Sequence, residues 1–165
     1  MGAPDIKELP TAFRITGLSP EPFQPLFDLP DDELARQGVK RCVADRPQAF
    51  PRRVEMRDAA PGETVLPLNH VCQSAETPYR ASHAIFVREG AAAAADRFDE
   101  APAVMRARLL SLRAFDADGM MVDADVVEGA VTEPLFARLP ANADVSYIHA
   151  HCAKRGYYSG RIERA

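Results

Sequence analysis

The sequence predicts an α+β fold: a single domain with a mainly antiparallel sheet and about three or four short helices. Strand-like stretches outnumber helical patterns and do not alternate with them strictly, which argues against a parallel sheet. Asp118-Gly119 lies between two runs of strand formers, the strongest short hairpin signal. With 165 residues and 47% hydrophobic content, the chain suits one domain with a real core.

The N-terminal third begins with an expected extended arm, residues 1–11, and residues 12–165 form the expected domain. Ala12–Thr16 has the composition of a short strand. Three prolines limit Ser19–Leu29 to a helical turn or two. Pro30–Gln37 should be a helix, because it begins with proline, carries acidic residues in its first turn and precedes a glycine.

The middle of the chain predicts a strand over Val39–Ala44 and then a pair of strands, Thr64–Val71 and Ala84–Arg88. Gln73–Ser82 connects that pair, and polar connections of this length are often functional. Asp99–Leu110 has the pattern of a helix, with Asp99 as its cap and an apolar stripe.

The C-terminal third predicts a hairpin over Leu112–Val127, with a two-residue turn and a positive φ at Gly119. Thr132 should cap a short helix that stops before Pro140. Two strands, Val145–His151 and Tyr157–Glu163, should close the domain around a turn at 153–156.

Charge and cysteine content limit the classes of binding partner and the cellular compartment that we expect. The formal net charge is −4, which disfavours nucleic acid and anionic membranes as partners, although residues 154–164 mix basic and aromatic side chains. Cys42, Cys72 and Cys152 are odd in number and form no C-x-x-C, so we expect free thiols in a reducing cytoplasm. The sequence lacks a signal-peptide pattern and an apolar run long enough to span a membrane.

All four histidines and two of the three cysteines lie in two stretches, 68–90 and 145–161. His149 and His151 are two residues apart in a strand and should share a face, as candidate catalytic acids or bases. They could hold a metal with His70 or His83, but no metal-ligand spacing signature supports this, so we expect no bound metal. An ordinary half-exposed polar strand face explains them as well.

The connection Gln73–Ser82, between the predicted strands Thr64–Val71 and Ala84–Arg88, suggests an anion-binding loop. Arg80 offers a forked set of donors, and hydroxyls accompany it. The candidate ligand-binding residues are Tyr79, Arg80, Ser82, His83, Tyr157 and Arg161. The alternative is a surface loop in which Arg80 pairs with Glu76 or Glu89.

The last hairpin gives a spatial prediction. Tyr147 should share the histidine face, with Tyr157, Ser159 and Arg161 beside it on the partner strand. The opposite face should turn its more apolar set into the core: Ile148, Ala150, Tyr158 and Ile162. A composite site follows if Arg80 reaches the histidines.

Four segments have a familiar appearance: FRITGL, TPYRASHAIFVREG, LLSLRAFDADGMMVDADVVEG and YIHAHCAKRGYYSGRIERA. Together, over roughly Phe13 to Ala165, they resemble a bacterial family known only as domain of unknown function 1203. The resemblance implies a small soluble bacterial protein and transfers no activity or site residue. The arm before Phe13 is an addition to that pattern.

The sequence therefore names no reaction and no cofactor, and it contains no P-loop, G-x-G-x-x-G, G-x-S-x-G or H-E-x-x-H motif. We expect a binding domain for a small anionic molecule, with a site capable of catalysis. The alternative is a non-enzymatic interaction or structural module. A concave pocket lined by both histidine-containing stretches would favour the first reading, and a flat surface the second.

Overall fold

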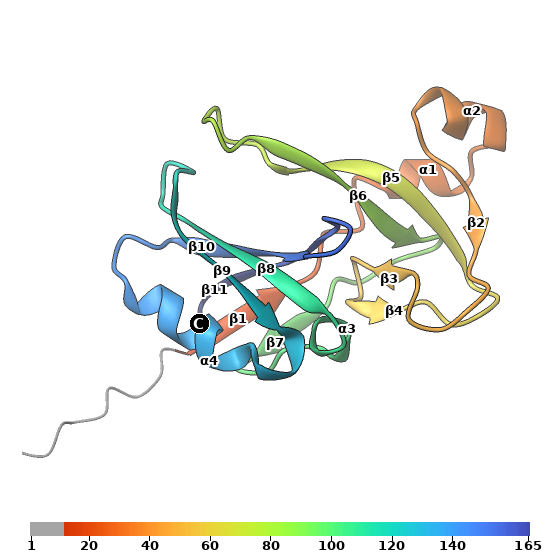
Figure 1. Cartoon of the computed structure of the whole chain (residues 1–165). Helices are drawn as coiled ribbons and strands as arrows, with labels where there is room; N and C mark the ends of the chain where they lie inside the picture. The colour runs from red at the N-terminus through yellow and green to blue at the C-terminus, as the bar shows by residue number, and fades with distance from the viewer. Residues whose placement is uncertain (1–11) are drawn as a thin grey trace, which may run out of the picture.

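The computed structural model describes residues 12–165 and contains two sheets (Figure 1). The six-stranded sheet has the order β7-β1-β11-β10-β8-β9. Its strands are β1 (Phe13–Thr16), β7 (Asp96–Phe98), β8 (Leu109–Phe115), β9 (Met121–Glu128), β10 (Tyr147–Cys152) and β11 (Tyr158–Arg164). The five-stranded sheet has the order β2-β5-β6-β3-β4. Its strands are β2 (Cys42–Val43), β3 (Pro51–Arg52), β4 (Arg57–Asp58), β5 (Thr64–Gln73) and β6 (Ala81–Arg88).

Short helices lie at the margins of the sheets. The α-helices are α1 (Gln24–Phe27), α2 (Asp31–Arg36), α3 (Ala103–Arg106) and α4 (Glu133–Arg138), and the 3-10 turns are η1 (Gly129–Val131) and η2 (Leu139–Ala141). Among the described residues, every strand pair is antiparallel except β3 with β6. The predicted α+β class with a mainly antiparallel sheet is confirmed. None of the helices between residues 12 and 165 has the length and apolar character needed to cross a bilayer.

Two large apolar clusters account for the arrangement. The first lies between the six-stranded sheet and α3 and α4, and it buries Leu112, Ile148 and Phe136 completely. The second includes Leu66 and Ile85 of the β5–β6 hairpin together with Tyr158 of the other sheet. Figure 1 shows the long β5–β6 hairpin running above β10 and β11. The six-stranded sheet is therefore covered on both faces, by helices on one and by the second sheet on the other.

The predicted helix over Asp99–Leu110 is wrong in extent, because only Ala103–Arg106 is helical. Asp99 has a positive φ of 58°, and its Oδ1 accepts a hydrogen bond from the Phe13 backbone N at 3.0 Å instead of capping a helix. Leu109 and Leu110 begin β8, where ladder pairing on both sides overrides their helix propensity.

The β8–β9 hairpin is confirmed, and Gly119 has the predicted positive φ of 83°. The predicted two-residue turn is wrong. The Asp116 backbone N donates to Met120 O at 2.9 Å, which leaves a three-residue loop, 117–119, and pairs Phe115 with Met121 instead of Val122. The Asp116 carboxylate stabilises this loop by accepting from the backbone N of Asp118 and Met120, each at 2.9 Å.

The β5–β6 strands are longer than predicted, so their connection shortens to residues 74–80, whereas β2 covers only part of Val39–Ala44. The connection packs on the β8–β9 loop, where Thr77 Oγ1 donates to Gly119 O at 3.1 Å. Gln73 Nε2 donates to the Tyr147 hydroxyl at 2.8 Å and links the two sheets. The expected arm, 1–11, lies outside the described residues.

The β8–β9 loop gives a stability prediction. A Cβ at Gly119 would lie 2.4 Å from the Ala75 Cβ, whereas a Cβ at Gly62, which also has a positive φ, would meet nothing within 4 Å. Both alanine substitutions incur the cost of a left-handed backbone, about 1 kcal/mol or more. We expect Gly119→Ala to destabilise the domain by about 1 kcal/mol more than Gly62→Ala, measured by urea unfolding.

The double variant Gly119→Ala/Ala75→Gly, compared with the single variant Ala75→Gly to subtract the cost of the added glycine, should lose only as much stability as Gly62→Ala does. Equal unfolding free energies for Gly119→Ala and Gly62→Ala would show that the loop does not press on Ala75.

Candidate functional site

The layer between the two sheets collects the histidines. Side chains of β5 alternate between its two faces, and His70 and Cys72 continue the core-facing set that begins with Leu66 and Leu68. On β6, His83 lies directly opposite His70 in the ladder. The core-facing side of β5 therefore begins with leucines and ends with a histidine and a cysteine.

The six-stranded sheet supplies the facing side. The rings of His149 and His151 lie 6.5 Å apart, and the His151 ring centroid is 4.6 Å from that of His83. The Tyr158 ring lies within 6 Å of the rings of His70, His149 and His151. All four histidines therefore belong to one aromatic layer, although they come from two distant stretches of sequence.

The prediction that Tyr158 faces away from the histidines is wrong. A register shift between Ala150 and His151 pairs His151 with Tyr158, and it turns the Tyr158 ring into the histidine layer. Ile148 and Ile162 remain opposite each other in the core on the other face, as predicted.

The histidine face is buried and not half-exposed. His149 and His151 expose 3% and 1% of their surface. Burial, reinforced by the nearby positive charges of Arg161 and Arg113, lowers the pKa of His149 to about 3; burial and Arg113 do the same for His151. Both imidazoles are therefore neutral at pH 7. Nδ1 of His149 is buried without a hydrogen-bond partner in the described part of the chain.

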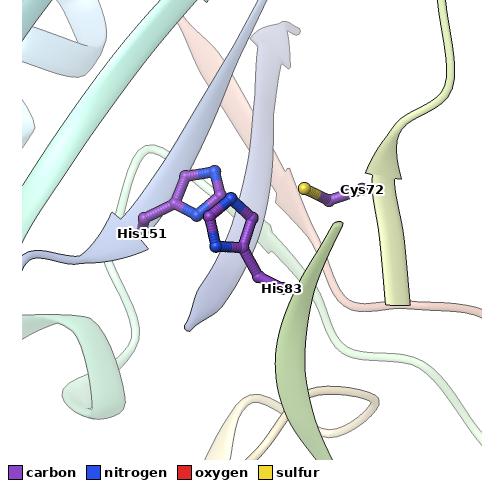
Figure 2. Close-up of side chains that lie close together, drawn as sticks. All are labelled: Cys72, His83 and His151. Carbon is purple, nitrogen blue, oxygen red and sulfur yellow. The ribbon is translucent and has the colours of Figure 1, made fainter. Parts of the chain in front are cut away.

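Three potential metal ligands converge in this layer. One ligand atom each from Cys72, His83 and His151 lies within 4.8 Å of the other two. Figure 2 shows the Cys72 sulfur directed from β5 toward the two imidazoles, whose rings lie edge to face. His151 Nδ1 lies 3.1 Å from the Gly156 carbonyl oxygen. Because a carbonyl only accepts, Nδ1 carries the proton and Nε2 keeps its lone pair.

Arg113 supplies positive charge beside these groups, although it is not among the site residues predicted from the sequence. It lies on β8 opposite His149, and its charge lowers the pKa of His83, His149 and His151. Within residues 12–165 its guanidinium forms neither an ion pair nor a side-chain hydrogen bond. Arg113 and Phe115 are two residues apart in β8, so both lie on the histidine side of that strand. This spacing was the signal for Arg113 that the sequence contained.

The predicted anion-binding loop lies at the end of the β5–β6 hairpin. Arg80 is exposed, and its guanidinium donates to Ser74 O at 2.5 Å within the same loop. Tyr79 packs on Phe115, 6.4 Å between ring centroids, and Ser82 is exposed. No hydrogen bond joins Arg80 to His149 or His151 in the described chain, so the composite site stays a prediction.

Arg161 lies on the histidine side, as predicted, with its guanidinium carbon 4.0 Å from the Tyr147 ring centroid, and it also pairs with Glu163. Tyr157 departs from that group. Its ring packs edge-on against Phe86 of β6, at 5.3 Å between centroids, and it lines a separate pocket.

That pocket has a volume of about 490 Å³ and lies where the loop 46–51 meets the turn between β10 and β11. Its lining comprises Arg46, Gln48, Ala49, Phe50, Pro51, Phe86, Ala107, Arg108, Leu109, Cys152, Lys154, Arg155 and Tyr157. Both histidine-containing stretches contribute, through Phe86 of the first and Cys152 to Tyr157 of the second. The volume falls within the usual range for small-molecule sites, about 300–1,000 Å³.

The lining contains four cationic side chains and no acidic one. Arg108 is neutralised by Asp58, at 2.6 Å, and donates to Gln48 O at 2.9 Å, so it supports the pocket wall. Arg46, Lys154 and Arg155 are exposed and have no ion pair within the described chain. Positive charge therefore concentrates at this pocket in a protein that is acidic overall.

A buried arginine lies behind the Cys152 wall. Arg53 exposes 1% of its surface, and its two terminal nitrogens donate to Ser159 Oγ and Cys152 Sγ, each at 3.3 Å. Nε has no partner among the described residues, and burial lowers the pKa of this guanidinium, while Cys152 opposes the shift. A guanidinium without a direct carboxylate partner is costly to bury, which indicates a role beyond packing.

Comparisons with known proteins give one match. Neither the curated proteins nor the solved structures contain a match to this sequence. A family model described as "Protein of unknown function (DUF1203)" matches residues 49–164, a range that includes the histidine layer, Arg53 and most of the pocket lining. The chain therefore belongs to the DUF1203 family.

Proposed function

We propose that this domain binds a small anionic molecule in the pocket between the loop 46–51 and the β10–β11 turn. The observation that carries the proposal is the lining: three cations without ion-pair partners in the described chain and no acid, around a cavity of about 490 Å³. Charge-assisted hydrogen bonds from guanidinium and ammonium groups are the usual means of holding carboxylates and phosphates.

The inner wall indicates a second feature of the ligand. Phe86 packs edge-on against both Phe50 and Tyr157, with ring centroids 5.5 and 5.3 Å apart. These rings give the pocket an apolar wall in addition to its exposed cationic side chains. A ligand with an anionic group on an aromatic or apolar body would satisfy both surfaces.

Arg53 and Cys152 add a buried guanidinium behind the pocket wall and a thiol in it. Arg53 cannot turn toward solvent, because it is buried, so its positive charge acts on the pocket through Cys152. The free thiols of Cys42, Cys72 and Cys152 support a reducing compartment, the cytoplasm, as the place of action.

The alternative function is a non-enzymatic interaction module. A concave pocket to which both histidine-containing stretches contribute favours the small-molecule site over that alternative. The proposed ligand chemistry is that expected from the sequence, but the proposed place is different, because Tyr157 rather than Arg80 lines the cavity.

The binding proposal is tested with phenyl phosphate as the probe, by isothermal titration calorimetry on the full chain. We expect Lys154→Gln/Arg155→Gln to weaken binding by about tenfold or more, which corresponds to roughly 1.4 kcal/mol. Inorganic phosphate and phenol should each bind more weakly than phenyl phosphate, since each satisfies only one surface of the pocket.

The matched control is Lys40→Gln/Arg97→Gln, which removes the same charge from exposed positions outside the pocket. It should leave the affinity within about twofold, because exposed charges at a distance are screened by salt. Equal losses in the two double variants would reduce the effect to net charge and contradict a built site.

Arg53→Met separates function from stability. Methionine fills a similar volume without charge, and removing a buried guanidinium that lacks a carboxylate partner should cost less than about 1 kcal/mol or stabilise the fold. We expect phenyl phosphate affinity to fall by about threefold to tenfold while the urea midpoint holds or rises. A loss of about 3 kcal/mol in unfolding free energy with unchanged affinity would make Arg53 purely structural.

Cys152 reports pocket occupancy. Because it lines the pocket and Cys42 does not, saturating phenyl phosphate should slow alkylation of Cys152 by iodoacetamide at least about threefold and leave Cys42 unaffected. Peptide mass mapping after timed labelling measures both sites in one sample. Identical protection of the two cysteines would indicate global tightening rather than a ligand in this pocket.

A further inference from the structure

We propose that Cys72, His83 and His151 form a binding site for a divalent transition metal, with zinc as the preferred ion. The three side chains come from three strands, β5, β6 and β10, and therefore from both sheets. The site is separate from the cationic pocket, since none of its three ligands lines that cavity.

The geometry fits a tetrahedral ion after a small adjustment. The three ligand atoms lie within 4.8 Å of one another. Zinc–sulfur and zinc–nitrogen bonds of about 2.3 and 2.0–2.1 Å imply ligand–ligand edges of about 3.3–3.6 Å. Closing this gap takes at most roughly 1.5 Å, which side-chain rotation of the half-buried Cys72 and His83 can provide. Figure 2 shows both imidazoles on the side toward which the sulfur points.

The hydrogen bond of His151 is the arrangement that metal-binding imidazoles usually have. Its Nδ1 donates to the Gly156 carbonyl oxygen at 3.1 Å, which fixes the ring and leaves Nε2 as the free lone pair. A Cβ at Gly156 would lie 3.4 Å from His83 Nδ1, so the same turn residue leaves room for the second imidazole beside it. The β10–β11 turn therefore orients one ligand and limits the position of another.

The protonation states also suit a metal. A neutral imidazole keeps one ring nitrogen with a free lone pair, and the hydrogen bond of His151 Nδ1 to Gly156 O leaves that lone pair on Nε2. Cys72 Sγ lies 3.4 Å from Ala81 O, the weak hydrogen bond of a thiol, and metal binding would displace its proton. The half-buried positions of Cys72 and His83 leave a route from solvent for the ion.

Arg113 determines what completes the coordination sphere. Three protein ligands leave a fourth tetrahedral position open, as in catalytic zinc sites. One thiolate neutralises only half of a divalent charge, and Arg113 adds another positive charge beside Cys72, His83 and His151. The fourth ligand should therefore be an anion, either hydroxide or an anionic group of a bound molecule, held by the metal and Arg113 together.

The sequence argued against a metal because its cysteines and histidines lack a spacing signature. Spacing signatures arise when ligands come from one short segment, whereas these three come from strands that only the packing of the sheets brings together. The sequence suggested only that His149 and His151 could hold an ion with His70 or His83, whereas the set that converges is Cys72, His83 and His151.

The test is titration of the reduced, chelator-treated full chain with Co²⁺ and then Zn²⁺. We expect one equivalent of Co²⁺ to give a thiolate charge-transfer band and tetrahedral d–d bands, and Zn²⁺ to displace it. Cys72→Ser and His83→Gln should each weaken Zn²⁺ binding by about 100-fold or more. Zn²⁺ should also protect Cys72, and not Cys42, from iodoacetamide in the unmodified protein.

The matched control is His70→Gln, which changes a half-buried imidazole on the same face of β5 that lies outside the ligand set. It should keep Zn²⁺ affinity within about threefold, and circular dichroism should show that all three variants are folded without metal. The proposal falls if the unmodified protein takes up no stoichiometric Zn²⁺, or if Cys72→Ser and His83→Gln bind it as the unmodified protein does. Binding of Cu²⁺ alone, with a thiolate band and no Zn²⁺ uptake, would overturn the assignment to zinc.

Discussion

The packing of the β5–β6 hairpin on β10 and β11 across a layer of imidazoles is the contact on which the rest of the structure depends. An ionised imidazole in such a layer would lose its hydration without gaining a partner, so the packed sheets favour the neutral rings. The lowered pKa values of His149 and His151 are the consequence. The layer thereby serves as core and as a set of available nitrogen ligands at once.

Strand alternation and a register shift divide the chemistry of β10 and β11 between two places. His151 faces the layer and the shift turns Tyr158 toward it, while Cys152 and Ser159 contact Arg53. Cys152 also reaches the cationic pocket. Because consecutive residues of a strand point to opposite faces, His151 in the layer and Cys152 at the pocket are neighbours in sequence with different surroundings.

Positive charge is distributed unevenly over an acidic chain. Arg53 is buried behind the pocket wall, and Arg113 lies beside the histidine layer; neither has a carboxylate partner in the described structure. Most other buried or half-buried arginines do have one, as Arg52 with Glu63 and Arg108 with Asp58 show. An arginine without a carboxylate partner, in a protein whose other buried arginines have one, is a favourable place for an anion to bind.

The sequence by itself determined the class of fold, the main hairpins and the two stretches that carry the histidines, because alternation and turn residues such as Asp118-Gly119 act locally. Only the tertiary structure decided that Leu109 and Leu110 are strand residues, that the histidine face is buried, and that Cys72, His83 and His151 converge. Those outcomes depend on which strands pair and on how the two sheets pack, and both are set by contacts between residues far apart in the chain. Arg53 and Arg113 could not be distinguished from other arginines by sequence for the same reason: an arginine becomes informative only when its partners, or their absence, are known.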